Sequence, residues 1–85
     1  MSEIHFTGYK RIVADPQYCD GQPRIEGTRI TVAAILSYIA GGMSVDKIVE
    51  EYPKLTSGDI YEALAFAAAH FNDRFIPLRL SPAGK

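Results

Sequence analysis

The stretch Gly21-Gln22-Pro23-Arg24-Ile25-Glu26-Gly27-Thr28-Arg29-Ile30 says more about the fold of this 85-residue chain than any other. Its two glycines and its proline favour tight turns, and they surround isoleucines, which favour a strand. An apolar run follows directly after Thr31, and a hydroxyl residue before such a run is a typical helix N-cap. The stretch therefore predicts a short strand held between two turns and leading into a helix.

Three helix starts share this arrangement. At each one an apolar residue precedes a hydroxyl residue, and a second apolar residue follows five positions after the first. The hydroxyl caps the helix while the two apolar side chains pack together as a hydrophobic staple. The caps are Thr31, Ser44 and Thr56, and for the third Asp59 completes a capping box. These signals predict helices over residues 32–40, 45–51 and 57–72.

The sequence also marks where these helices end. Gly41-Gly42 ends the first helix because glycine adopts positive φ without steric cost, and Pro53 ends the second. The third helix is expected to turn one stripe of side chains toward the core, namely Ile60, Leu64, Ala67 and Phe71.

Extended segments are predicted on both sides of the helices. Residues 9–14 predict a strand, with Arg24-Ile25 as its short partner. Residues 74–80 alternate, and Pro77 limits them to an edge strand. We expect a mainly α fold, a three-helix bundle of helix-turn-helix layout with a short N-terminal β-arm or hairpin. The expected parts of this single domain are a β-arm over 1–30, the helices over 31–72 and a basic apolar tail over 73–85.

A motif match points to one protein family. The string Gly-x-Pro-x-Ile-x-Gly-Thr-Arg-Ile over residues 21–30, with Tyr-Pro-Lys-Leu-Thr over residues 52–56, resembles the domain-of-unknown-function family 433. The residues that carry the match are Gly21, Pro23, Ile25, Gly27, Thr28, Arg29, Ile30, Tyr52, Pro53 and Leu55. The resemblance runs from about Tyr9 to Asn72 and implies a homeodomain-like antitoxin of bacteria. It also implies a partner of the PIN-like ribonuclease class, often encoded next door.

The composition favours a small cytoplasmic protein that associates with itself. Hydrophobic residues make up 47% of the chain, and so short a chain buries only about 60–65% of its unfolded surface. Excess apolar surface favours a homodimer or larger oligomer. The sequence shows no signal peptide or membrane span, and its single cysteine, Cys19, lacks metal-ligand spacing. We therefore expect no cofactor, metal or membrane contact.

The distribution of charge bears on nucleic-acid binding. Residues 31–72 carry two lysines against five acidic residues, and no lysine or arginine occurs between Ser57 and Asp73. A recognition helix over residues 57–72 would therefore meet DNA phosphates with carboxylates, which is unfavourable. If the protein is instead a DNA-binding autorepressor, the phosphate contacts come from the arm and one inter-helix turn, namely Lys10, Arg11, Arg24, Arg29 and Lys54.

Arg29 has two interpretations. Its planar guanidinium suits a phosphate or a partner's carboxylate. The interpretation that we favour is structural, with Arg29 joining the arm to a helix through an ion pair with Glu51 or Asp59.

The third helix is apolar on every side over residues 63–69, so one core stripe does not account for it. Small side chains allow a second helix to approach closely. The residues expected at a dimer interface are Ala63, Ala65, Ala67 and Ala68. The alternative is that the helix is wrapped by its own domain.

The tail is the expected partner-binding segment. It combines basic and apolar residues in an extended pattern, namely Arg74, Phe75, Ile76, Leu78, Arg79 and Leu80. Such a segment suits a sheet edge or a groove of another chain, although it could equally fold back on its own domain. Because PIN-like nucleases hold metal with carboxylates, a basic plug could occlude their cleft.

Catalysis has little support in the sequence. No Ser/His/Asp set, paired-carboxylate cleft or phosphate-binding glycine loop is visible, and His5 and His70 lack obvious partners. We therefore expect an antitoxin that is not an enzyme. The alternatives are the DNA-binding regulator and a dimerising interaction module with neither partner.

Overall fold

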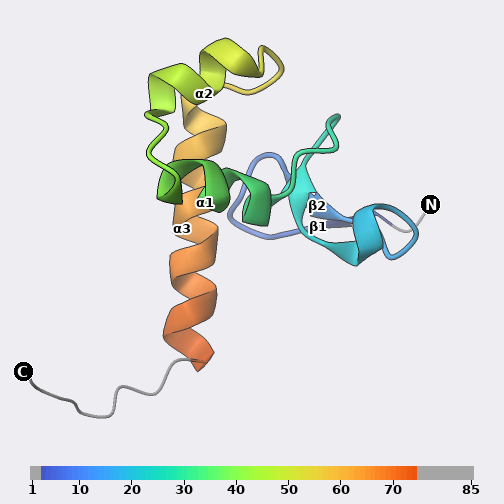
Figure 1. Ribbon diagram of the computed structural model, residues 1–85. Helices are drawn as coiled ribbons and strands as arrows, with labels where there is room; N and C mark the ends of the chain where they lie inside the picture. The colour runs from blue at the N-terminus through green and yellow to red at the C-terminus, as the bar shows by residue number, and fades with distance from the viewer. Residues whose placement is uncertain (1–2, 75–85) are drawn as a thin grey trace, which may run out of the picture.

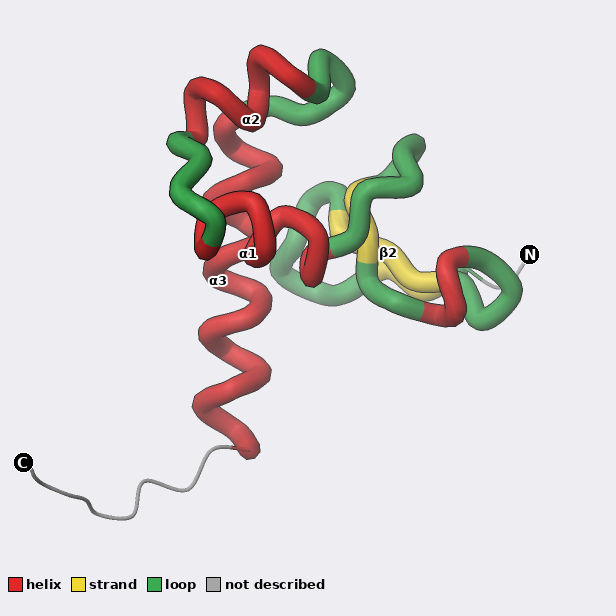
Figure 2. Tube along the Cα trace, viewed as in Figure 1, coloured by secondary structure: helices red, strands yellow, loops and turns green. Residues whose placement is uncertain are grey.

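The computed structural model describes residues 3–74, and side chains as far as residue 70. Three short strands precede three helices (Figures 1 and 2). The strands are β1 (Ile4–His5), β2 (Ile12–Ala14) and β3 (Arg24–Ile25), with a single 3₁₀ turn at Cys19–Gly21 between the last two. The helices are α1 (Val32–Ala40), α2 (Val45–Glu51) and α3 (Ser57–Arg74).

The predicted caps account for the helix starts. Thr31 Oγ1 accepts a hydrogen bond from the Ala34 amide at 3.0 Å, and Ser44 Oγ accepts one from the Lys47 amide at 3.1 Å. The predicted starts of all three helices and the ends of α1 and α2 are confirmed, while α3 ends at Arg74 rather than at residue 72. Only the second glycine after α1 has positive φ, at 101° for Gly42, so the glycine requirement lies there.

The strands form one antiparallel sheet in the order β1-β2-β3. In the register, Ile4 pairs with Ala14 and Ile12 pairs with Ile25. All three residues of β2 are buried, and because successive side chains point to opposite faces, this central strand is covered on both sides. β2 is shorter than the strand predicted over residues 9–14, and β1 was not predicted because both of its residues are exposed and show no alternation.

The prediction of a mainly α, homeodomain-like helix-turn-helix bundle with a β-arm is wrong. The structure is a small domain of mixed α and β structure in which sheet and helices share a single core. Ile12 and Ile25 are each no more than 1% exposed and belong to the same buried cluster as the helix residues Ile35, Ile48 and Ile60. Three short helices leave one side of their core open, and the sheet closes it. Strands of two or three residues carry too little periodicity for sequence patterns to reveal this role.

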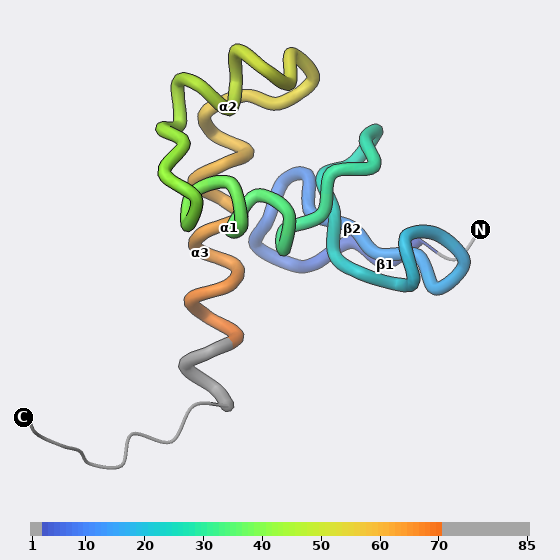
Figure 3. The backbone as a smooth tube through the Cα atoms, in the orientation of Figure 1, coloured from blue at the N-terminus to red at the C-terminus, as the bar shows by residue number. Residues whose placement is uncertain are grey.

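α3 is the element on which the rest of the domain is built. α1 and α2 pack against α3, and the loop between β1 and β2 passes beside it (Figure 3). The ring of Phe6 in that loop lies 4.9 Å from the ring of Phe66 in α3. The buried stripe of α3 runs through Ile60, Ala63 and Phe66. The core-facing stripe therefore lies on a different side of the helix from the one predicted. Leu64 and Ala67 are only half-buried, and the side chain of residue 71 lies outside the described part. None of the described helices combines the length and apolar character needed to cross a membrane.

Candidate functional site

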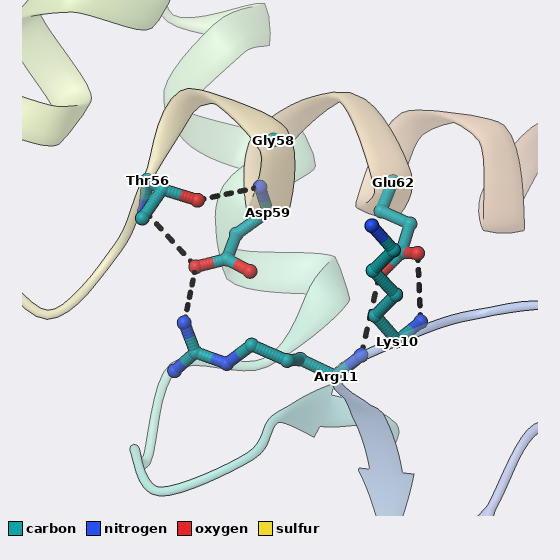
Figure 4. Close-up of a pocket in the computed structure, with 6 residues that line it drawn as sticks. All are labelled: Lys10, Arg11, Thr56, Gly58, Asp59 and Glu62. Carbon is teal, nitrogen blue, oxygen red and sulfur yellow. Dashed lines mark hydrogen bonds and ion pairs between the residues drawn. The ribbon is translucent and has the colours of Figure 1, made fainter.

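A pocket of about 380 Å³ lies where the sheet meets the first turn of α3 (Figure 4). The residues that line it come from the loop before β2 and from the start of α3, namely Lys10, Arg11, Thr56, Gly58, Asp59 and Glu62. The capping box places the Asp59 carboxylate at this helix start. The loop residues that face Asp59 lead directly into β2. Charged residues that are far apart in the sequence therefore lie close together in this pocket.

Asp59 is the centre of the pocket's hydrogen bonds. Its Oδ2 accepts from the Thr56 amide at 2.9 Å, and the Thr56 hydroxyl accepts from the Asp59 amide at 3.2 Å, which is the reciprocal pattern of a capping box. The same Oδ2 accepts from Arg11 Nη1 at 3.0 Å, and Arg11 Nη2 donates to the Glu26 carbonyl at 2.9 Å. Asp59 is only 4% exposed, so the carboxylate of this ion pair is shielded from solvent.

Glu62 fastens the loop before β2 to α3. Its carboxylate accepts from the backbone amides of Lys10, at 2.7 Å, and Arg11, at 3.3 Å. Both carboxylates of the pocket are therefore occupied by bonds within the chain, and neither is a free general base. The chemistry of this pocket is that of a polar joint between sheet and helix.

One group of three potential metal ligands occurs among the described residues, distinct from the carboxylates of this pocket. Ligand atoms of Glu3, His5 and Glu26 lie within 4.8 Å of one another near the sheet. Glu3 is already paired with Arg24, whose Nη2 donates to it at 2.8 Å. These three residues could hold a metal ion only in competition with that guanidinium.

The family motif forms a tight turn that we call the motif turn, residues 25–30. The Ile25 amide donates to the Ile30 carbonyl at 3.0 Å, and the Thr28 amide donates back to the Ile25 carbonyl at 3.0 Å. Thr28 Oγ1 donates to the Ile25 carbonyl at 2.8 Å and accepts from the Ile30 amide at 3.0 Å. Gly27 has φ of 80°, which favours glycine at the tip. The motif thus encodes one closed turn between β3 and α1.

Two arginines of the motif lie beside one tyrosine. The guanidinium carbon of Arg24 is 4.4 Å from the centroid of the Tyr18 ring, and that of Arg29 is 5.2 Å from it. Arg24 is 7% exposed, whereas Arg29 is exposed. The structure does not bring Arg29 to Glu51 or Asp59, and no carboxylate of residues 3–70 forms an ion pair with it. The ion pair that we favoured for Arg29 is thus absent from the described residues, since Asp59 holds Arg11 instead.

Two of the other residues proposed for phosphate contacts are used within the chain. Arg11 and Arg24 are bound to carboxylates of their own chain, while Lys10 and Lys54 are exposed.

The residues proposed for a dimer interface differ in their burial. Ala63 is fully buried inside its own domain and Ala67 packs against the core. Ala65 and Ala68 are exposed. The tail residues 75–80 lie outside the described residues.

A tyrosine pair joins the first two helices. The rings of Tyr38 in α1 and Tyr52 at the end of α2 stack at 5.1 Å with an interplanar angle of 9°. A hydrogen bond with the Tyr52 hydroxyl, followed by burial, raises the pKa of Tyr38 above its ordinary 10.0.

The sequence did not predict the contacts of Tyr18 and Tyr38 or the hydrogen bonds of Glu62, because no spacing rule connects residues this far apart. The one available signal was the capping box, which predicts where Asp59 points.

The comparisons with known proteins identify the family of the chain but no individual relative. A search of curated proteins and a search of solved structures each found no match to the chain. The family model described as "Protein of unknown function (DUF433)" matches residues 12–67, which include the motif turn, the three helix starts and the Arg11-facing wall of the pocket at Asp59 and Glu62. This match covers more than half of the 85 residues. The chain therefore belongs to the DUF433 family of proteins of unknown function.

Proposed function

We propose that the protein is an antitoxin-like member of a toxin–antitoxin pair, and that its C-terminal residues 73–85 bind and occlude the cleft of a PIN-like ribonuclease. Membership of the family supports the proposal through the antitoxin role that the resemblance implies. The chemistry of the segment supports it too. Arg74 and Arg79 with the apolar residues between them suit a cleft walled by metal-binding carboxylates.

The observation that carries the proposal is the projection of α3. Its second half continues past α1, α2 and the sheet (Figure 1). Beyond Ala67, which packs against the core, the described side chains of Ala68, Ala69 and His70 are exposed, so the domain does not cover this end of the helix. A helix whose end leads away from its own core leaves that end free to contact another molecule. The end of α3 at Arg74 is the start of the proposed nuclease-binding segment.

The same helix supports self-association. Over residues 57–69 its exposed side chains are Ser57, Tyr61, Ala65, Ala68 and Ala69, none of which is charged. The outer face of a helix in a monomer is ordinarily charged or polar, and depletion of charge is typical of interface cores. Tyr61 is 60% exposed on this face. We include in the proposal a homodimer formed through this outer face of α3.

The test is neutralisation of a PIN-like nuclease encoded next to this protein. Growth is measured when the nuclease is expressed with the full chain, with a shortened chain ending at residue 72, and with the charge variants Arg79→Glu and Lys54→Glu. We expect rescue by the full chain, no rescue by the shortened chain, and weaker rescue by Arg79→Glu. Lys54→Glu makes the same change of charge at an exposed residue of the domain, and it should rescue normally.

Helicity and thermal melting of each variant are measured first. A shortened chain that melts close to the full chain and still neutralises the nuclease would contradict occlusion by the C-terminal segment. Nanomolar, sequence-selective binding of the isolated protein to its upstream DNA would favour a DNA-binding regulator instead. Rescue of growth by no form of the protein would favour a dimerising module without a toxin partner.

A further inference from the structure

We infer that Arg29 is an anchor for a carboxylate of the partner protein, presented by the motif turn and held in place by Tyr18 and Arg24. The inference deepens the proposed function and rests on it, because the partner is the same nuclease-class protein. It adds a second contact, on the domain itself, that is separate from residues 73–85.

The first support is the rigidity of the motif turn that carries Arg29. Backbone hydrogen bonds close the turn between Ile25 and Ile30, and both the donor and the acceptor capacity of the Thr28 hydroxyl are used within it. Arg29 is exposed on this closed turn, which projects between β3 and α1 (Figure 1). A side chain on an ordered turn loses less conformational freedom on binding than one on a flexible loop.

The second support is the buried Arg24 beneath the turn. Its Nε donates to the Thr28 carbonyl at 3.1 Å, and that carbonyl belongs to the peptide group joining Thr28 to Arg29. Its Nη2 donates to Glu3, while Nη1 is buried without a hydrogen-bond partner among the described residues. Arg24 therefore fixes the backbone of Arg29, and its Nη1 group is left without an acceptor.

The third support is the position of the Arg29 guanidinium. It lies over the Tyr18 ring, where a cation–π contact at an exposed site restricts an arginine without neutralising it. The ring also contacts Arg24, so two positive groups share one aromatic face or edge. An incoming carboxylate would bind the exposed fork of Arg29 in bidentate geometry. Arginine and tyrosine held in this way are typical of the few residues that dominate a protein interface.

The charges nearby favour a protein carboxylate over a nucleic-acid backbone. Binding along a phosphate backbone needs several free cations on one surface. Here Arg24 is buried and paired, and Arg11 is paired with Asp59. A single exposed arginine suits a single acidic side chain.

The experiment measures binding of the full-length protein to the purified neighbouring nuclease by calorimetry. We expect Arg29→Ala to weaken the affinity at least tenfold. Arg29→Lys keeps the charge but loses the planar fork, and it should restore less than half of that loss. Lys54→Ala removes an equal charge from another exposed position and should change the affinity less than about twofold. Because Arg29 is exposed, the melting temperatures of the Arg29 variants should stay close to that of the wild type.

Each outcome decides the question. Equal affinities for Arg29→Ala and the wild type overturn the inference and leave the proposed function standing. Full restoration by Arg29→Lys, or an equal loss in Lys54→Ala, shows general charge attraction and also overturns it. A wild-type chain that does not bind the nuclease overturns the proposed function and this inference together. If Arg29→Ala loses duplex DNA binding in a gel shift while nuclease binding is unchanged, Arg29 contacts phosphate instead.

Discussion

Asp59 joins two parts of the molecule through one carboxylate oxygen. That oxygen completes the N-terminal cap of α3 by accepting from the Thr56 amide, and it also accepts from Arg11 beside β2. Arg11 in turn donates to the Glu26 carbonyl at the start of the motif turn. A single buried acid thereby connects α3, the sheet and the turn that presents Arg29. Its loss should affect stability more than any exposed acid.

We predict that Asp59→Ala lowers the free energy of unfolding by about 2–3 kcal/mol, because it removes a helix cap and leaves Arg11 without its carboxylate. The matched control is Asp46→Ala, which removes an exposed acid from the first turn of α2 and should cost less than about 1 kcal/mol. Urea unfolding followed by circular dichroism measures both. Similar losses in the two variants would show that the Arg11–Asp59 pair does not fasten the sheet to α3.

At the scale of the elements, the stacked tyrosines connect α1 to the end of α2. The pKa of Tyr38 is raised, first by the hydrogen bond with Tyr52 and then by burial, so the folded state retains the Tyr38 proton at a pH where the unfolded chain releases it. Its contribution to stability is therefore present below the unfolded pKa of about 10 and is lost as the pH rises through the folded value. The contact between α1 and α2 should weaken in strong alkali.

We predict that Tyr52→Phe lowers the pKa of Tyr38 toward 10.0, because it removes the largest cause of the shift. Residue-specific titration of the tyrosine ring signals by NMR measures this change. Tyr61→Phe is the control, since Tyr61 is 60% exposed on α3 and does not contribute to the shift. An unchanged Tyr38 titration in Tyr52→Phe would mean that burial alone shifts the pKa.

At the scale of the whole molecule, we expect the uncharged outer face of α3 to be covered by a second copy of the chain. We predict a homodimer that Ala68→Glu dissociates, because the change places a charge at an exposed position on this face. Ala67→Glu is less informative, since Ala67 packs against the core and its substitution would also destabilise the fold. Ala33→Glu, at an exposed position on α1, is the matched control and should stay dimeric.

Sedimentation equilibrium at micromolar concentration measures the oligomeric state of the three proteins. A wild-type chain that sediments as a folded monomer of 9.4 kDa would refute the dimer. If Ala33→Glu dissociates as readily as Ala68→Glu, the interface is not confined to the outer face of α3. If only Ala33→Glu dissociates, the interface lies on α1.

The elements of this fold could largely be predicted from sequence, but their arrangement could not. Thr31, Ser44 and Thr56 each cap a helix through an amide only three residues away. The sheet instead depends on the pairing of Ile12 with Ile25 and on the packing of both residues against α1 and α3. No short sequence pattern predicts these contacts. The helix-turn-helix prediction failed for this reason.

The candidate sites divide in the same way. The motif turn is local, and its hydrogen bonds join residues that are close in the chain, so the sequence by itself determined that Gly27, Thr28 and Arg29 form a tight turn before α1. Only the tertiary structure decided which charges remain free. The loop before β2 packs against the start of α3 and thereby pairs Arg11 with Asp59 and uses Glu62, while packing of the sheet buries Arg24. Arg29 stays exposed beside Tyr18, because whether a charge is paired depends on distant residues that meet only when the chain folds.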